Sequence, residues 1–362
     1  MSYSSPFIQE TIAAIQPVSQ AGVRRAEALW DRLTKPPGSL GRLESLGTQY
    51  VAMTQSLPEK NPDAMMFILA ADHGVAREGV SAYPSSVTAQ MVKNFLQGGA
   101  AINVLGRRIG AKIRVVDMGV QEDMGAPSGL WVRKIGLGTH NMCEGPAMSR
   151  DQAVQSVEEG IRLVQEAYDD GVRLIGIGEM GIGNTTASSA ITAVMTRHPV
   201  AEVTGRGTGV DALQLARKIQ VIERGIQQNT PDADDPLDVL AKVGGFEIGG
   251  LVGILVGGAA CRVPVVLDGF ITGAAALLAV ALAPQCQAYM IPSHLSAEPG
   301  HRLAMDSLGL RPLLDLDLRL GEGTGACLAI GLLQASLACL TQMATFERAG
   351  VDEAVRPSPE MA

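Results

Sequence analysis

Residues 172–190 read VRLIGIGEMGIGNTTASSA, and this stretch decides the fold. An apolar run at 172–177 is followed by Gly178 and Glu179, then by a glycine-rich loop, and a helical pattern starts at Ala187. A short apolar run bounded by such a loop is typical of a strand that is buried on both faces of a parallel sheet. The stretch therefore predicts a strand–loop–helix unit of an α/β protein.

The same pattern recurs along the chain. Further short apolar runs predict strands at residues 65–70, 113–116, 263–267 and 288–291. Helices are expected at residues 86–96, 150–170 and 324–343. Strands that alternate with helices predict a mostly parallel sheet covered by helices.

The first 60 residues differ from the rest, because they look helical and polar-faced around a turn at 35–39. We expect residues 1–60 to form an N-terminal helical segment. Residues 61–315 are expected to form the α/β domain, 316–350 a turn and a C-terminal helix, and 351–362 a loose tail.

Polar residues follow the carboxyl ends of the predicted strands. They are Asp72, His73, Asp117, Glu179, Asp268 and His294. Ligands of parallel α/β sheets bind beyond these ends. We therefore expect these side chains to gather along one edge of the sheet, as in an enzyme.

Composition excludes several classes of protein. The 362 residues include 29 basic and 37 acidic ones, a formal net charge of −8, and only 4% are aromatic, which argues against a nucleic-acid partner. The most apolar stretch, 249–283, is interrupted by Arg262 and Asp268, and the N-terminus lacks a signal-peptide pattern. The five cysteines show no CxxC spacing. A cytoplasmic protein without a membrane partner is expected.

Residues 176–181 read GIGEMG, a literal G-x-G-x-x-G. A dinucleotide site would place a pyrophosphate at the next helix, but the charge of Glu179 inside this loop opposes that. The loop continues through Gly183, Asn184 and Thr185, where capping side chains and a helix N-terminus suit a single phosphate. A glycine-rich turn with ordinary capping explains the pattern about equally well.

A second glycine-rich loop, TGRGTG at 204–209, precedes a helix that carries Arg217 and Lys218. Its backbone N–H groups and the lysine could complete a phosphate cradle. By itself, the loop is better explained as a flexible connection followed by a solvated basic turn.

Glu322 lies between glycines in GEGTG, residues 321–325, directly before the apolar helix. We expect it on an exposed turn beside apolar walls that raise its pKa, which suits a general base. A glutamate that favours a helix N-terminus by its charge is a close alternative.

Two weaker groups remain. His294, Glu298 and His301 form H-x3-E-x2-H, which differs from the H-E-x-x-H zinc spacing, so we expect them to bond to substrate, backbone or each other. Tyr83 could wall a flat ligand and Gln90 could offer an amide, although an ordinary helix entry is the simpler explanation.

Taken together, the motifs resemble those of the nicotinate-nucleotide:dimethylbenzimidazole phosphoribosyltransferase family. The matching stretches follow the family order over nearly the whole chain: LTKPPGSLGRLE from Leu33, ADHGV from Ala71, GVSAYPSSVTAQMV from Gly79, GEMGIGNTTASSA from Gly178, GRGTG from Gly205, GGFEIGGLVG from Gly244, DGFITGAAALLA from Asp268, SHLSAEPGH from Ser293 and LRLGEGTGACLA from Leu318. One departure is Cys327, where alanine is more familiar.

The resemblance implies a homodimer with a Rossmann-like α/β domain and a small helical domain from both termini. It implies transfer of the 5-phosphoribosyl group of nicotinate mononucleotide to dimethylbenzimidazole, which gives α-ribazole 5′-phosphate and nicotinate with inversion at C1′, for cobalamin biosynthesis. The family's catalytic base matches Glu322, and a nearby carboxylate matches Glu179. Its phosphate and ribose site matches Gly181, Gly183, Asn184, Thr185, Gly205, Gly207, Thr208 and Lys218. Its base pocket involves Ser81, Tyr83 and Gln90.

No cofactor and no metal are expected, because the pyridinium of the donor is already a good leaving group. Two other classes stay open: an NAD(P)-dependent oxidoreductase, suggested by the G-x-G-x-x-G match, and a non-catalytic nucleotide sensor. The preferred acceptor, whether dimethylbenzimidazole, adenine or a phenol, does not follow from the sequence.

Overall fold

The computed structural model describes residues 5–207, 209 and 211–352. The chain divides into two compact units. The first contains Asp63–Gly331 together with the N-terminal residues up to Pro17, and the second contains Val18–Pro62 together with the residues from Leu332 onward. The sequence grouped residues 1–60, whereas α1 (Pro6–Ala14) packs against α11 (Phe246–Ala260) inside the first unit.

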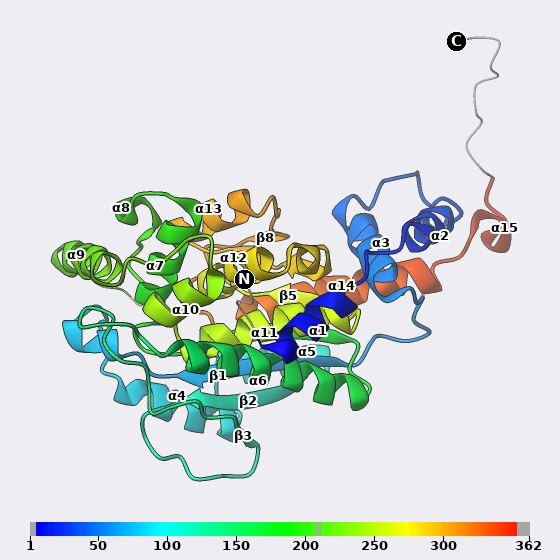
Figure 1. The fold of residues 1–362 in the computed structure, drawn as a ribbon. Coiled ribbons are helices and arrows are strands. Elements are labelled where there is room, and N and C mark those ends of the chain that lie inside the picture. The colour runs from blue at the N-terminus through cyan, green and yellow to red at the C-terminus, as the bar shows by residue number, and fades with distance from the viewer. Residues whose placement is uncertain (1–4, 208, 210, 353–362) are drawn as a thin grey trace. The chain divides into compact units, whose positions relative to one another are not determined.

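The first unit is built around a six-stranded sheet in which all neighbouring strands are parallel (Figure 1). The strands, in the spatial order β3-β2-β1-β4-β5-β6, are β3 (Leu130–Val132), β2 (Lys112–Gly119), β1 (Ala64–Ala71), β4 (Leu174–Met180), β5 (Val265–Leu267) and β6 (Met290–Pro292). The predicted parallel α/β sheet is confirmed. The edge strand β3 was not predicted, because its apolar run, LWV, is only three residues long, and only one of them is buried.

Side chains of β1 alternate between two covering layers, as the pleat of a strand requires. Met66 lies beside Gly323, directly before α14 (Thr324–Gln342), whereas Leu69 lies beside Gly250 of α11. The helix α6 (Arg150–Asp169) packs so closely on α11 that a Cβ at Gly160 would overlap the backbone of Gly250. The central strands β1 and β4 are therefore covered on both faces, which explains why β1 is apolar throughout and why β4 carries a single charged residue, Glu179, near its end.

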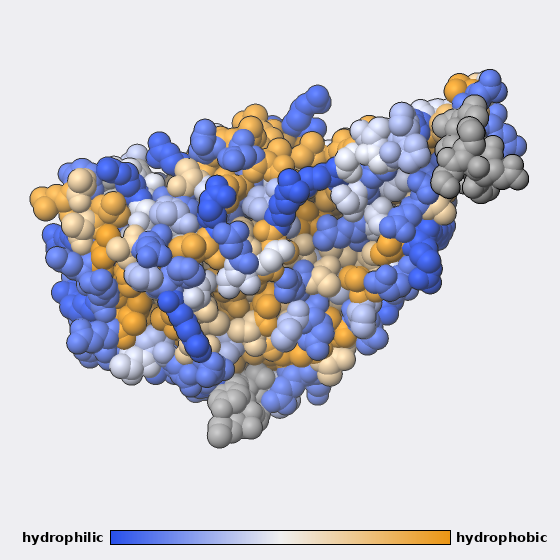
Figure 2. Space-filling model, turned by 90° about the horizontal axis from the view of Figure 1, so that it is seen from above, coloured by the Kyte–Doolittle hydropathy of each residue, from blue (hydrophilic) through white to orange (hydrophobic). Residues whose placement is uncertain are grey.

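The remaining elements of the first unit surround this sheet. They are η1 (Gly74–Glu78), α4 (Ser86–Gln97), α5 (Ala101–Ile109), α7 (Asn184–Thr196), α8 (Val200–Val203), α9 (Ala212–Asn229), α10 (Pro236–Val243), α12 (Phe270–Leu282), η2 (Pro284–Tyr289), α13 (Pro299–Ser307) and a small parallel pair, β7 (His294–Leu295) with β8 (Leu314–Asp315). On the face shown in Figure 2, hydrophobic surface is interspersed with hydrophilic residues.

The second unit is helical and joins segments from both ends of the chain. It contains α2 (Gln20–Trp30), α3 (Arg42–Thr54), the part of α14 from Leu332, and α15 (Phe346–Ala349). Trp30, Val51 and Leu340 belong to its buried core, and Leu33 pairs with Thr345 in an isolated antiparallel bridge.

The helix α14 is long and apolar enough to span a membrane, the one such helix among the residues that the structure describes. However, 56% of its most apolar window is buried inside the protein. A largely buried core helix of a water-soluble protein passes the same test, so length and composition are weak indications of a membrane span here.

Candidate active site

The carboxyl ends of β1 and β4 lie side by side where the strand order of the sheet reverses. From β1 the sheet continues toward β2 on one side, and from β4 it continues toward β5 on the other. Open α/β sheets bind ligands outside the carboxyl ends of the strands at such a point. Asp72 and His73 follow β1, and Glu179 lies near the end of β4. The polar edge predicted from the sequence is therefore present at this position.

Asp117 does not line this edge as expected. It lies within β2, where its carboxylate accepts a hydrogen bond from the Val120 N–H at 2.8 Å and pairs with Lys134 at 3.1 Å. It lines neither of the two cavities described next. Asp117 therefore holds the loop after its own strand.

A cavity in the first unit collects most of the residues singled out in the sequence. Among the residues that line it are Glu179, Gly181, Asn184, Thr185, Gly207, Asp268, His294, Glu298 and Glu322. They come from the ends of β4 and β5, the start of α7, the loop before α9, β7, the N-cap of α13 and the turn before α14. Segments far apart in the sequence thus converge on one site.

Glu322 is buried in this cavity, with 7% of its surface exposed, so the expected exposed turn is wrong. The turn fits closely against β4 because Gly178 has no side chain: a Cβ there would overlap the backbone nitrogen of Gly323. Burial, and then the nearby carboxylate of Asp268, raises the pKa of Glu322 to about 7. The expected upward shift of the Glu322 pKa is confirmed, and the group can exchange a proton near neutral pH.

Asp268 holds the turn that carries Glu322. Its carboxylate accepts hydrogen bonds from the backbone N–H groups of Gly323 at 3.1 Å, Gly325 at 2.8 Å and Ala326 at 3.2 Å. These groups are the otherwise unpaired donors at the start of α14. The sequence placed Asp268 at a strand end but gave it no such role, since the partner lies more than fifty residues later in the chain.

The carboxyl group of Glu179 is close enough to Glu322 for the two charges to interact. Glu179 belongs to β4 rather than to the loop, it is buried, and its carboxylate accepts a hydrogen bond from the side-chain amide of Asn184. Burial, followed by the charges of Asp268, Glu247 and Glu322, raises the pKa of Glu179 to about 8. A carboxyl group with this pKa is mostly neutral at pH 7, so it adds little negative charge beside Glu322.

The helix after the glycine-rich loop starts earlier than predicted. Helix α7 begins at Asn184, with Gly183 at the N-cap in a left-handed conformation (φ 99°), rather than at Ala187. The side chain of Asn184 therefore points to Glu179 and does not cap the helix, contrary to expectation. Gly181 and Gly183 both lie against His73, where a side chain on either would press on the imidazole or its Cβ.

The two glycine-rich loops meet at Lys218. Its ammonium group donates hydrogen bonds to the hydroxyl of Thr185 at 2.8 Å and to the carbonyl of Gly205 at 3.4 Å, and a Cβ at Gly207 would lie 3.3 Å from it. Lys218 is only 1% exposed, and burial lowers its pKa to about 8. The predicted neighbourhood of both loops is thus formed, while Thr208 lies outside the described residues.

The three residues expected in a base pocket are not brought to this cavity. Ser81 accepts a hydrogen bond from the N–H of Tyr83, Tyr83 is 52% exposed, and Gln90 is exposed on α4. None of them lines the cavity that contains Glu322. The same segment still reaches the site through Thr88, whose hydroxyl accepts the N–H of Ile182 at 3.1 Å.

The histidines and the glutamate of the H-x3-E-x2-H motif hydrogen-bond to neighbouring backbone and side-chain groups of the protein. His301 accepts the N–H of Ser296 through Nδ1 at 2.9 Å, and burial lowers its pKa to about 3. Glu298 accepts the N–H of Gly207 at 2.8 Å, and His294 contacts the hydroxyl of Ser293 at 3.0 Å. Across the described part of the chain, no group of His, Cys, Asp and Glu has an arrangement that could hold a metal ion.

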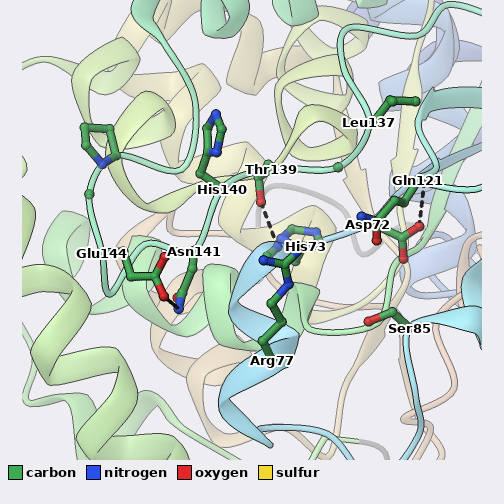
Figure 3. A pocket seen from close by; sticks show the side chains of 14 residues that line it. Asp72, His73, Arg77, Ser85, Gln121, Leu137, Thr139, His140, Asn141 and Glu144 are labelled. Atoms are coloured by element: carbon green, nitrogen blue, oxygen red, sulfur yellow. Dashed lines mark hydrogen bonds between the residues drawn. The ribbon is translucent and has the colours of Figure 1, made fainter.

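A second cavity, of about 510 Å³, is lined by His73 and by residues of the segment 137–146 (Figure 3). Asp72 and Arg77 are among its lining residues, and burial raises the pKa of Asp72. The imidazole of His73 pairs with the buried carboxylate of Glu247 and separates this cavity from the glycine loop. Glu247 was missed in the sequence, although its place between glycine pairs in GGFEIGG was a signal.

The chain shows extensive similarity to curated proteins. A family model described as phosphoribosyltransferase matches residues 15–351. A nicotinate-nucleotide–dimethylbenzimidazole phosphoribosyltransferase of Roseiflexus sp. (strain RS-1) is 56% identical over 344 residues, which cover 95% of this chain and 98% of that protein. The chain belongs to this family. A family member with the same name from Desulforudis audaxviator (strain MP104C) is 54% identical over 347 residues, covering 96% and 98%.

Solved structures of the family have the same fold. The crystal structure of CobT from Thermus thermophilus aligns with a TM-score of 0.87 and 45% identity over 92% of this chain and 100% of that one. A structure of nicotinate-nucleotide–dimethylbenzimidazole phosphoribosyltransferase from the same organism aligns with a TM-score of 0.86 and 43% identity over 93% and 100%. The resemblance drawn from the motifs is therefore confirmed, and these relatives support neither the oxidoreductase nor the sensor.

Proposed function

We propose that this chain transfers the 5-phosphoribosyl group of nicotinate mononucleotide to dimethylbenzimidazole, giving α-ribazole 5′-phosphate and nicotinate, in cobalamin biosynthesis. Membership of the family over nearly the whole chain supports this activity. The observation that carries it is one cavity that combines a carboxylate of pKa about 7 with loops held by a buried lysine.

In this reaction a ring nitrogen of the acceptor bonds to C1′ while the bond from C1′ to the pyridinium nitrogen breaks. The bonding electrons leave with nicotinate, so the positive charge of its ring disappears. Glu322 takes the proton from the other nitrogen of the acceptor, and the product carries a neutral imidazole ring. Attack from the opposite face inverts C1′ through a transition state with oxocarbenium character, and holding both rings in line supplies much of the rate.

We assign the 5′-phosphate to the loops around Lys218, with Gly181, Gly183, Asn184, Thr185, Gly205, Gly207 and Thr208 as further binding residues. The ammonium of Lys218 and the start of α7 both favour an anion. Glu179 stands beside Glu322 as the second carboxyl group. Ser81, Tyr83 and Gln90 remain our candidates for the acceptor pocket.

The proposed setting is a homodimer in the cytoplasm. Leu320 lines the cavity and is 57% exposed, and Leu316 nearby in the sequence is 54% exposed. A second subunit that covers such side chains would shield the reacting groups from water. Sedimentation at several concentrations measures the oligomeric state, and a monomer at all of them would contradict this proposal.

Turnover tests the function directly. Purified protein is incubated with nicotinate mononucleotide and, in turn, dimethylbenzimidazole, adenine and a phenol, and products are identified by mass. We expect the benzimidazole product and stoichiometric nicotinate. Binding of reduced nicotinamide cofactor without any phosphoribosyl transfer would instead indicate the oxidoreductase class.

The activity should depend on pH through Glu322. A general base must be ionised, and burial raises the pKa of Glu322 to about 7. We therefore expect kcat/KM for the mononucleotide, at saturating acceptor, to rise about tenfold per pH unit below pH 7. Above about pH 8 it should fall again, because Lys218, whose pKa burial lowers to about 8, loses the charge that binds the phosphate. A profile that is flat between pH 5 and 8 would exclude Glu322 as the titrating base.

Replacing Lys218 with alanine should raise KM for nicotinate mononucleotide by roughly 10- to 100-fold, because a charge-assisted contact to phosphate is lost. Binding of free dimethylbenzimidazole, measured by calorimetry, should stay unchanged. Equal weakening of both ligands would indicate a structural defect, and no change in either would place the phosphate elsewhere.

Exhaustive chelation should leave full activity. The donor carries one phosphate, and the charge of its leaving group is relieved as the bond breaks, so a divalent ion would add little at C1′ and would compete for Glu322 and Glu179. Chelated protein is assayed beside metal analysis of untreated protein. Stoichiometric zinc, with activity lost on chelation and restored by zinc, would overturn this expectation.

A further inference from the structure

One carboxylate oxygen of Glu298 accepts no hydrogen bond from the residues that the structure describes. The Oε1 atom accepts the N–H of Gly207, but the Oε2 atom is buried and has no hydrogen-bond partner among the described residues. The whole residue is only 6% exposed. Leaving a buried acceptor unpaired is unfavourable by roughly 1–3 kcal/mol, more when it is charged, so a donor from a bound ligand is the natural complement.

Glu298 lies between the Glu322 cavity, where the base of the donor is expected, and the glycine loops, where its phosphate is expected. It lines the cavity that contains Glu322, and it also lines a neighbouring hollow formed by Gly205, Gly207 and Arg319. In a mononucleotide the ribose connects the base to the phosphate. Glu298 lines both hollows, as Gly207 and Arg319 also do, so its side chain lies at the junction between the base end and the phosphate end, within reach of the sugar.

The charge of Glu298 also fits a sugar rather than a phosphate. A phosphate has no favourable contact with a carboxylate, whereas a ribose hydroxyl donates a hydrogen bond to one, as acidic residues of nucleotide-binding folds do. Two other carboxylates of the cavity are already hydrogen-bonded, since both oxygens of Asp268 accept backbone N–H groups and Glu179 binds Asn184, and Glu322 is assigned to the acceptor.

We propose that Glu298 binds the vicinal diol of the donor ribose and that its Oε2 accepts a hydrogen bond from the 2′- or 3′-hydroxyl group. This role rests on the proposed phosphoribosyl transfer. It makes Glu298 a specificity residue that separates ribonucleotides from their deoxy analogues.

The test is a double-mutant-type cycle in which the side chain of Glu298 and the hydroxyl groups of the substrate are changed separately and together. Wild type and Glu298→Gln are assayed with nicotinate mononucleotide and with its 2′-deoxy and 3′-deoxy analogues. Glutamine keeps an oxygen for the Gly207 N–H, so the loop stays anchored, but it loses the charged acceptor. We expect E298Q to lower kcat/KM roughly 10- to 100-fold for the ribonucleotide and hardly at all for the analogue that lacks the bonded hydroxyl.

For each substrate, kcat/KM of wild type is divided by kcat/KM of E298Q. This ratio cancels the intrinsic reactivity of each sugar, because that reactivity affects both enzymes equally. A purely structural role predicts one equal loss for all three substrates, and that result would overturn the proposal. The control Glu202→Gln changes an exposed glutamate of α8 and should behave as wild type.

A binding measurement separates this inference from the proposed function. Ribose 5-phosphate and 2-deoxyribose 5-phosphate are titrated into both proteins by calorimetry, which needs no turnover. If wild type fails to process nicotinate mononucleotide but prefers ribose 5-phosphate in a Glu298-dependent way, the transferase function falls and this role stands. If turnover is normal and E298Q shows the same sugar preference as wild type in both assays, this role falls alone.

Discussion

Replacing Glu322 with glutamine is expected to lower kcat by roughly 10²- to 10⁴-fold, the usual contribution of a general base. Glutamine has nearly the same shape but cannot take the proton from the acceptor nitrogen. The effect should appear in kcat rather than in KM for either substrate, because the proton moves only as C1′ is attacked. Initial rates at saturating donor and acceptor measure it.

The matched control is Glu223→Gln, which changes an exposed glutamate on α9 and should keep wild-type kcat. Thermal unfolding of both variants checks that the fold survives. A folded E322Q enzyme with near-normal kcat would falsify the role of Glu322 as base. A loss confined to KM would instead make it a binding residue.

Replacing Asp268 with alanine is expected to cost about 3 kcal/mol or more of unfolding free energy and to remove most activity. The change leaves the N–H groups of Gly323, Gly325 and Ala326 without their acceptor at the start of α14. The turn that carries Glu322 then loses its anchor, and a displacement of about 1 Å at such a site reduces rates roughly 10²-fold. Calorimetric unfolding and initial rates measure the two effects.

Asp268→Asn removes the charge but keeps part of the anchoring, because its one amide oxygen can still accept the N–H groups of Gly325 and Ala326 while the bond to Gly323 is lost. The charge of Asp268 is one cause of the raised pKa of Glu322, so its removal should lower that pKa and move the acidic limb of the pH profile to lower pH. A D268A protein as stable as wild type would show that water or backbone adjustment replaces the carboxylate. An unshifted profile in D268N would show that burial alone sets the Glu322 pKa.

The sheet could be predicted from the sequence because its central strands are buried on both faces. β1 is an uninterrupted apolar run that ends at a polar pair, and β4 starts with a run of apolar and glycine residues that ends at Glu179, just before the glycine loop. β3 could not be predicted, because its place depends on pairing with β2 and not on its own composition. The start of α7 was misplaced because Asn184 resembles a capping residue but hydrogen-bonds across the loop to Glu179.

The candidate site was predictable where a residue stands in a distinctive local setting. Glu322 between glycines and Lys218 after a glycine loop are such cases. The burial of Glu322 was not predictable, because it follows from the absence of a side chain at Gly178, over 140 residues earlier in the chain. Pairs such as His73 with Glu247 depend on contacts of the same long range, which no local pattern contains.

The backbone at position 322 bears on attempts to make the protein more robust. Glu322 has a φ of 62°, between Gly321 at 81° and Gly323 at 82°. A side chain in this left-handed region costs roughly 1 kcal/mol, and burying a carboxylate adds to that. Glycine or asparagine at 322 relieves both penalties, so laboratory evolution for heat resistance alone would reward discarding this glutamate. Each round of such selection therefore needs an assay of turnover, because the most heat-stable variants would include inactive ones.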